Sequence, residues 1–212
     1  MKESALTAEE RATLASYRLI AGARSAAHDM PEFWRPEFER FARLLPSGHV
    51  LDVGCGSGRD VGLFLQGGYA YTGIDLCDEM LALARLRAPQ ADFRQMDMYG
   101  LEFLDGSFDG FWAVTSLLHL PKSRVDAALG EMRRVTVKGG AGLVIMKEGA
   151  GERMVRGPFD GDERFYAFYT LREFRTVLKR CGFTVLEAER DEAGGTPPNK
   201  PLVWLKYFVR TR

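Results

Sequence analysis

Residues 50–58, Val-Leu-Asp-Val-Gly-Cys-Gly-Ser-Gly, form a short apolar run that leads into three glycines at alternate positions. A glycine turn after a buried strand lets the backbone approach a ligand closely, because no side chain stands in the way. The next apolar run, residues 71–75, ends in Asp75, and an acid at the tip of the second strand suits the two hydroxyls of a ribose. The sequence therefore predicts a site for a nucleoside-containing cofactor at the carboxyl edge of a parallel sheet.

The spacing of the glycines helps to decide between classes of cofactor. A dinucleotide-binding turn has the pattern G-x-G-x-x-G. Here Gly54, Gly56 and Gly58 alternate, and Arg59 stands where the third dinucleotide glycine belongs. Asp52 precedes the turn, where its carboxylate would repel a pyrophosphate. A ligand with a cationic end and no phosphate, such as S-adenosylmethionine, fits this turn better, and an NAD-dependent enzyme is disfavoured.

The stretch 50–58 together with Asp75 resembles the class I S-adenosylmethionine-dependent methyltransferases, in particular small bacterial enzymes of the methyltransferase-11/25 type. Further segments that resemble those enzymes are the one after the third strand (95–98), the fourth strand (108–114), the loop after it (115–121) and the fifth strand with its glycine turn (138–145). The resemblance implies an α/β fold. We expect a doubly wound, Rossmann-like sheet of about seven strands, mostly parallel with the last strand antiparallel, under an N-terminal helical lid.

The composition restricts the class of protein further. The chain has 212 residues with 29 basic and 29 acidic side chains, so its formal net charge is zero. A nucleic-acid enzyme usually carries a basic face, so nucleic acid is an unexpected partner. Cys55, Cys77 and Cys181 show neither metal-ligand spacing nor an even-numbered disulfide framework, which favours a reducing cytoplasm and no metal site. We expect no signal peptide and no membrane span.

The chain is predicted to form a single domain in three parts. These are an N-terminal helical cap (1–46), a cofactor-binding half (47–147), and a substrate insertion with a C-terminal hairpin (148–212). The expected helices are 7–27, 31–45, 58–66, 79–87, 121–135 and 170–182, and the expected strands are 49–53, 70–75, 91–95, 108–114, 141–147, 183–189 and 202–209. The last two strands lack an intervening helix and should pair antiparallel across a Gly/Pro turn at 194–201. Residues 148–169 are expected to be a long charged and aromatic insertion.

Helix starts are marked by residues that can cap the backbone. Thr7 with Glu10, and Thr170 with Glu173, have the spacing of a capping box. Asp78 is placed to cap the helix that follows the second strand.

Cofactor-binding residues are expected along the turn, the second strand and the two following loops. They are Asp52, Gly54, Cys55, Gly56, Gly58, Asp75, Leu76, Met80, Asp97, Met98 and Thr115. The glycines should approach the methionine part, and Asp75 should accept the ribose hydroxyls. Cys55 is a small side chain in the turn with no chemistry assigned. Leu76 and Met80 either pack near the adenine or belong to the helix core.

Two of these acids have alternative interpretations. Asp52 orients the turn or meets the ammonium through water; the alternative is a strand-end carboxylate that caps nearby amides. The resemblance implies that Asp97 receives the adenine amine, with the Met98 amide at a ring nitrogen. The alternative is a loop aspartate that caps its own backbone.

The acceptor side is less defined by the sequence. His119 follows the fourth strand and is a candidate catalytic residue, as a general base or a substrate contact. Histidine is frequent at this place in the resembling enzymes, so a structural role stays open. Arg164 and Tyr166 in the insertion and Tyr17 on the first helix are candidate substrate-binding residues. Their alternative is a solvated surface around an apolar anchor.

The expected function is methyl transfer from S-adenosylmethionine to an O, N or S atom of a small molecule. The Asn/Asp-Pro-Pro-Tyr element of resembling adenine and glutamine N-methyltransferases is absent, and Thr115-Ser116-Leu117-Leu118 stands in its place. Two alternatives are a tRNA or rRNA methyltransferase, in which the arginines of the insertion meet phosphate, and a non-catalytic S-adenosylmethionine-binding subunit. The sequence allows a monomer or a homodimer.

Overall fold

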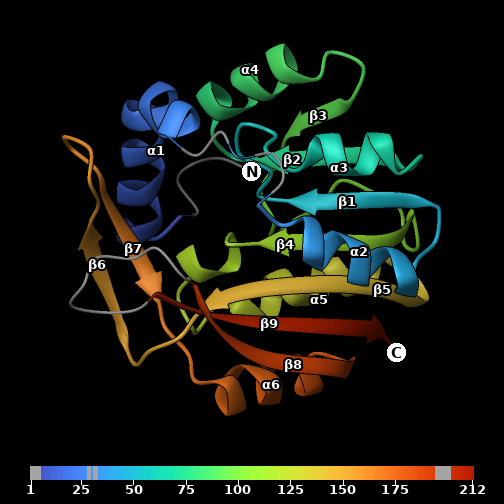
Figure 1. The fold of residues 1–212 in the computed structure, drawn as a ribbon. Helices are drawn as coiled ribbons and strands as arrows, with labels where there is room; N and C mark the ends of the chain where they lie inside the picture. Colours follow the sequence, from blue (N-terminus) through green and yellow to red (C-terminus); the bar gives the residue numbers. More distant parts are fainter. Residues whose placement is uncertain (1–5, 28–29, 31–32, 194–201) are drawn as a thin grey trace.

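The computed structural model describes residues 6–27, 30, 33–193 and 202–212, which build one seven-stranded sheet and a separate two-stranded hairpin (Figure 1). The strands of the sheet are β1 (His49–Val53), β2 (Ala70–Asp75), β3 (Asp92–Gln95), β4 (Phe108–Val114), β5 (Thr136–Lys147), β8 (Phe183–Ala193) and β9 (Leu202–Thr211). Their order is β3-β2-β1-β4-β5-β9-β8, and β9 runs antiparallel to both neighbours while the other pairs are parallel. The expected fold class is confirmed.

Helices alternate with the strands, as parallel pairing requires. They are α1 (Ala8–Ala27), α2 (Arg35–Leu44), α3 (Val61–Gln66), α4 (Asp78–Arg87), the short 3-10 helix η2 (Leu117–His119), α5 (Val125–Val135) and α6 (Leu171–Arg180). The chain winds outward from β1 to β3, then returns to β4 and winds outward the other way. Right-handed crossovers therefore place α3 and α4 on one face and α5 and α6 on the other. The switch between β1 and β4 is where open α/β sheets bind ligands.

The central strands are apolar on both faces because helices cover each side. Val50, Leu51 and Val53 of β1 are fully buried, as are Phe111 and Trp112 of β4. Asp52 interrupts the apolar run of β1 and is only 4% exposed. A carboxyl group in such a place needs hydrogen-bond partners, which directs attention to the end of β1.

Both capping boxes are confirmed. The Thr7 hydroxyl accepts from the Glu10 amide at 3.2 Å, and the Glu10 carboxylate accepts from the Thr7 amide at 2.7 Å. Thr170 and Glu173 cap α6 in the same reciprocal way. Asp78 is not a cap: it is the first residue of α4, and the cap position is Cys77, which makes no side-chain capping bond.

Several boundaries differ from those expected. Helix α3 begins at Val61 and not at 58, because the preceding glycines adopt left-handed backbone angles that no α-helix contains. Helix α5 begins at Val125 and not at 121, and β5 begins at Thr136 and not at 141. Strands β8 and β9 extend further than expected. Helix α2 begins at Arg35, while the predicted start at Pro31 and the predicted turn at 194–201 lie outside the described residues.

The insertion after β5 has regular structure that was not expected. It forms an antiparallel hairpin of β6 (Glu152–Arg156) and β7 (Glu163–Ala167). Hydrogen bonds tie β7 to α1: the Thr13 hydroxyl accepts from the Phe165 amide at 2.9 Å, and the Ser16 hydroxyl accepts from the Glu163 amide at 3.1 Å. The hairpin and α1 therefore lie side by side at the end of the sheet to which β1, β4 and β5 point (Figure 1).

Within the described residues, no helix is long and apolar enough to cross a membrane.

Candidate functional site

A pocket opens at the carboxyl ends of β1, β2 and β4, where the strand order switches. Helix α1 covers it along its length. The residues that α1 and the chain just before it contribute to the lining are Leu6, Glu10, Thr13, Leu14, Tyr17, Arg24 and Ser25. Of these, only Tyr17 is among the candidate substrate-binding residues of the sequence analysis. The others follow the helical spacing of one face of α1, which is the signal that could have identified them.

The glycine turn forms one wall of the pocket. Gly54, Gly56 and Gly58 have φ angles of 76°, 55° and 71°, in the left-handed region that favours glycine. A Cβ atom on Gly54 would lie 2.4 Å from the Cβ of Ser116, so a side chain there would also collide with the loop after β4. The turn is fixed to β2 because the Gly54 and Cys55 amides both donate to the Ile74 carbonyl. The backbone of the turn therefore reaches the pocket without intervening side chains.

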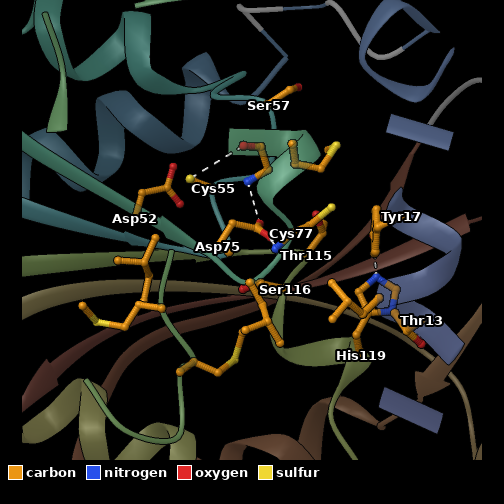
Figure 2. Close-up of a pocket in the computed structure, with 18 of the residues that line it drawn as sticks. Thr13, Tyr17, Asp52, Cys55, Ser57, Asp75, Cys77, Thr115, Ser116 and His119 are labelled. Atoms are coloured by element: carbon orange, nitrogen blue, oxygen red, sulfur yellow. Dashed lines mark hydrogen bonds between the residues drawn. The ribbon is translucent and has the colours of Figure 1, made fainter. Parts of the chain in front are cut away.

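Asp75 lies at the tip of β2, on the pocket edge (Figure 2). Its Oδ2 accepts from the Gly56 amide at 2.9 Å, and its Oδ1 accepts from the Cys77 amide at 2.9 Å. Desolvation raises the pKa of Asp75, and these backbone bonds oppose the rise. Each carboxylate oxygen can accept a further hydrogen bond, so Asp75 offers two adjacent acceptors to a pair of hydroxyls.

Asp52 lies beneath the turn and also lines the pocket. Its Oδ2 accepts from the Tyr71 hydroxyl at 2.7 Å, and not from the amides of the turn. Burial and then the neighbouring Asp60 carboxylate raise the pKa of Asp52 to about 8. Asp60 itself is held by two hydrogen bonds from Arg59, at 2.7 and 2.8 Å. The buried Asp52 group can therefore gain its charge when a cation arrives beside it.

The end of the pocket beyond β2 and β3 is mainly apolar. It is lined by Leu76, Met80 and Met98, which are three of the predicted cofactor-binding residues. The Oδ1 atom of Asp97 accepts from the Tyr99 amide at 2.8 Å, which is the local capping bond of the alternative interpretation. This bond leaves the carboxylate further capacity to accept from a ligand.

A network that sequence analysis did not identify closes the same end. The Tyr99 hydroxyl donates to Glu10 Oε1 at 2.6 Å, and Arg124 pairs with the other oxygen of Glu10. Glu10 belongs to α1, Tyr99 to the loop after β3, and Arg124 precedes α5. The network therefore fastens α1 over this end of the pocket.

Tyr17 and His119 meet at the opposite end (Figure 2). Tyr17 Oη lies 2.8 Å from His119 Nε2, and His119 Nδ1 lies 2.7 Å from the Phe165 carbonyl oxygen. A carbonyl only accepts, so Nδ1 carries the hydrogen and Nε2 accepts from the tyrosine hydroxyl. Arg164 Nη1 donates to the Tyr17 oxygen at 3.2 Å. Burial holds the pKa of His119 well below its ordinary value, and nearby cations add to this effect.

The other two predicted substrate-binding residues lie behind this pair and do not line the pocket. Arg164 is 5% exposed and pairs with the fully buried Asp162 through Nε at 2.6 Å. The ring centroid of Tyr166 lies 4.7 Å from that of His119. Both residues therefore support the pocket wall from β7.

The loop after β4 completes the site. Thr115 lines the pocket and, alone among the described non-glycine residues, has a positive φ, of 59°. Ser116 follows it, and its Oγ is buried without a hydrogen-bond partner among the described residues. A strained backbone and an unpartnered buried hydroxyl at a pocket wall are both typical of ligand contacts. Ser116 is not among the site residues predicted from the sequence.

The comparisons with known proteins agree with this geometry. A model of the methyltransferase domain family matches residues 50–140. The methyltransferase GfsG of Streptomyces halstedii is 30% identical over 182 residues, which cover 77% of this chain and 62% of that protein. The first relatives match over only about a third to three fifths of their own length.

Solved structures show the same architecture. A 1,6-didemethyltoxoflavin-N1-methyltransferase of Burkholderia thailandensis, with bound S-adenosylhomocysteine, has a TM-score of 0.73 at 23% identity, covering 99% of this chain and 93% of that one. A SAM-dependent methyltransferase of Methanosarcina mazei has a TM-score of 0.73 at 22% identity, covering 83% and 97%. From the family match, the sheet order and the glycine turn facing Asp75, we conclude that this chain belongs to the class I S-adenosylmethionine-dependent methyltransferases, of the methyltransferase-11/25 type.

Proposed function

We propose that this protein binds S-adenosylmethionine and transfers its methyl group to an O, N or S atom of a small molecule. The observation that carries the proposal is Asp75, held at the pocket edge by the amide of Gly56 with its carboxylate facing the cavity. The proposal is supported by relatives that include two O-methyltransferases, cnsE of Penicillium expansum and resE of Aspergillus sclerotiorum.

The residues of the pocket fit this cofactor. The glycine turn and the unpartnered Ser116 hydroxyl would hold the methionine part, and Asp52 would face its positive charge. Asp75 would hold the ribose, with Leu76 and Met80 beside the adenine. When bound, S-adenosylmethionine supplies a methyl group on a sulfonium, which is a good leaving group. The protein then has to align the acceptor and exclude water.

Helix α1 and the β6–β7 hairpin are the elements that would exclude water. The Thr13 and Ser16 hydroxyls accept hydrogen bonds from the Phe165 and Glu163 amides of β7, and these bonds fasten the hairpin to the helix that lines the pocket. The three segments of the chain therefore have distinct proposed roles: a helical cap (1–46), a cofactor-binding half (47–147) and a region that contributes to the acceptor site (148–212).

We further propose a small molecule and not a nucleic acid as the acceptor, since the formal net charge is zero. A cytoplasmic location is supported by three free cysteines. The protein is proposed to act as a monomer or a homodimer.

Cofactor choice is the first test of the proposed function. We expect S-adenosylhomocysteine to bind the purified protein in titration calorimetry, and NAD not to bind. The reason is that the alternating glycines and Asp52 leave no site for a pyrophosphate. Binding of NAD without binding of S-adenosylhomocysteine would overturn the proposal.

The Asp52 carboxyl predicts how cofactor affinity depends on pH. Its pKa is about 8 without ligand, above the ordinary 3.8, so the group is mostly protonated at pH 6. A cation bound beside it lowers this pKa, so binding releases a proton and tightens as the pH rises toward 8. We expect S-adenosylmethionine to bind roughly tenfold more tightly at pH 7.5 than at pH 6.

Calorimetry in buffers of different ionisation enthalpy measures that proton release. The matched control is Asp52→Asn, which retains the titration of the ligand's own amino group and loses that of the carboxyl. An unchanged pH dependence in Asp52→Asn would show that another group titrates.

A further inference from the structure

The end of the pocket at Tyr17 holds more hydrogen-bond donors than acceptors. Thr13 and Tyr17 line this end, and the Thr13 oxygen already accepts from the Phe165 amide, which leaves its hydroxyl hydrogen to donate. The Tyr17 oxygen already accepts from Arg164. Arg24, which also lines the pocket, has its guanidinium 5.4 Å from the centre of the Tyr17 ring. A ligand group here meets the Thr13 hydroxyl and the positive charge of the Arg24 guanidinium.

His119 is not placed to take a proton from an acceptor. Its Nδ1 hydrogen is engaged by the Phe165 carbonyl, and its Nε2 faces the Tyr17 hydroxyl. Burial, and then the cations Arg164, Arg24 and Lys147, hold the pKa of His119 well below its ordinary range, so an imidazolium is disfavoured here. His119 therefore acts as a positioning residue for Tyr17.

Among the residues that the structure describes, cations outnumber carboxylates around Tyr17 and His119. Arg164 of β7 and Lys147 of β5 lie behind it, and Asp162 is the carboxylate that faces both. The Nζ atom of Lys147 lies 4.3 Å from the ring centre of Tyr166, which in turn packs on His119. Desolvation and then Arg164 lower the pKa of Lys147 to about 8, so it is mostly protonated at neutral pH. Arg24 of α1 and the Arg59–Asp60 pair complete the charged groups near Tyr17.

We propose that the acceptor is an acid, a phenol, enol or carboxylic acid, that binds at Tyr17 as its oxyanion. The inference rests on the proposed function and specifies its substrate class. An oxyanion competes with His119 Nε2 for the Tyr17 hydrogen, and charge-assisted hydrogen bonds are about twice as strong as neutral ones. Arg164 is paired with Asp162, so the additional positive charge of Lys147 stabilises the same anion.

Amine acceptors are disfavoured by the same arrangement. An amine enters as a cation at neutral pH and meets a wall of donors, with the cations Arg164 and Lys147 behind that wall. No described side chain at this end is placed as a base to remove its proton. A carboxylic acid, or a phenol or enol acidic enough to ionise at neutral pH, loses its proton to water before it binds, so it needs no protein base.

The test uses the protein saturated with S-adenosylhomocysteine and two probes of similar size, 4-nitrophenol and benzylamine. The ionised form of 4-nitrophenol absorbs visible light and the neutral form does not, so absorbance against pH gives the pKa of the bound phenol. We expect that pKa to fall by about one unit or more relative to free 4-nitrophenol. Benzylamine should bind about tenfold more weakly than 4-nitrophenol, or weaker still, because the positive charge around the site repels the ammonium and attracts the phenolate.

The variant Lys147→Met tests the source of the shift. The variant should fold, because it removes a cation that is costly to bury. We expect the pKa of bound 4-nitrophenol to be lowered by roughly half as much as in the parent protein. Its affinity for S-adenosylhomocysteine should be unchanged. Lys122→Met is the matched control, since Lys122 lies over the ring of Tyr169 and pairs with Glu173 away from the pocket.

The outcomes separate this inference from the proposed function. Failure of S-adenosylhomocysteine to bind contradicts the proposed function. Normal binding of S-adenosylhomocysteine, with benzylamine preferred over 4-nitrophenol, overturns only the acidic acceptor. An unshifted pKa, or no binding of 4-nitrophenol at millimolar concentration, overturns it as well.

Discussion

Substitution of Gly54 by alanine is expected to abolish binding of S-adenosylhomocysteine at concentrations that saturate the parent protein. Two effects add at this position. The φ angle of 76° costs an L-residue about 1–2 kcal/mol. The new Cβ would lie 2.4 Å from the Cβ of Ser116, and relief of such overpacking costs about 1–3 kcal/mol more.

Gly68→Ala is the matched control for this experiment. Gly68 has a φ of 77°, almost the same as Gly54, but a Cβ there would have nothing within 4 Å. Its substitution therefore carries the backbone cost of about 1–2 kcal/mol without the collision. It lies at the end of α3, away from the pocket, so cofactor affinity should not change.

Denaturant unfolding gives the free energy of each variant, and calorimetry gives its affinity. We expect Gly54→Ala to lose about 2–5 kcal/mol of unfolding free energy, against about 1–2 for Gly68→Ala. If Gly54→Ala folds and still binds S-adenosylhomocysteine like the parent, the turn does not contact the ligand.

The cofactor half was predictable because its signals are local. The absence of a side chain permits the positive φ angles of Gly54, Gly56 and Gly58, and the apolar run before them is typical of a buried strand. The position of Asp75 follows from the length of the next strand. Each of these features depends on neighbours within a few residues, so one sequence is sufficient to find them.

The acceptor half depends on contacts between distant segments. The tautomer of His119 is set by the carbonyl of Phe165 on a hairpin that no sequence period revealed. Tyr17 reaches His119 because the Thr13 and Ser16 hydroxyls fasten α1 to the same strand. Tyr17 and His119 are more than 100 residues apart in the sequence, and no local propensity specifies such a pairing.

Substitution of Asp75 by alanine is the second prediction with a large expected effect. It removes a charged hydrogen-bond acceptor and leaves the ribose hydroxyls unpaired. The expected loss of binding free energy is about 1.5–3 kcal/mol, or about 10- to 150-fold in the dissociation constant. Asp78→Ala is the matched control, because Asp78 is exposed three residues further along and does not line the pocket.

Asp75 also supports the turn, so a loss of affinity alone would not distinguish contact from misfolding. Its oxygens accept from the Gly56 and Cys77 amides, and alanine leaves both amides without that partner. A second ligand resolves this point. We expect 2′-deoxy-S-adenosylhomocysteine to bind the parent more weakly than S-adenosylhomocysteine, and Asp75→Ala to bind the two ligands equally, since a direct hydrogen bond appears as coupling in such a cycle. If the variant still prefers the ribose form by the parent's ratio, Asp75 acts only on the turn, and the acceptor of the ribose hydroxyl is another group.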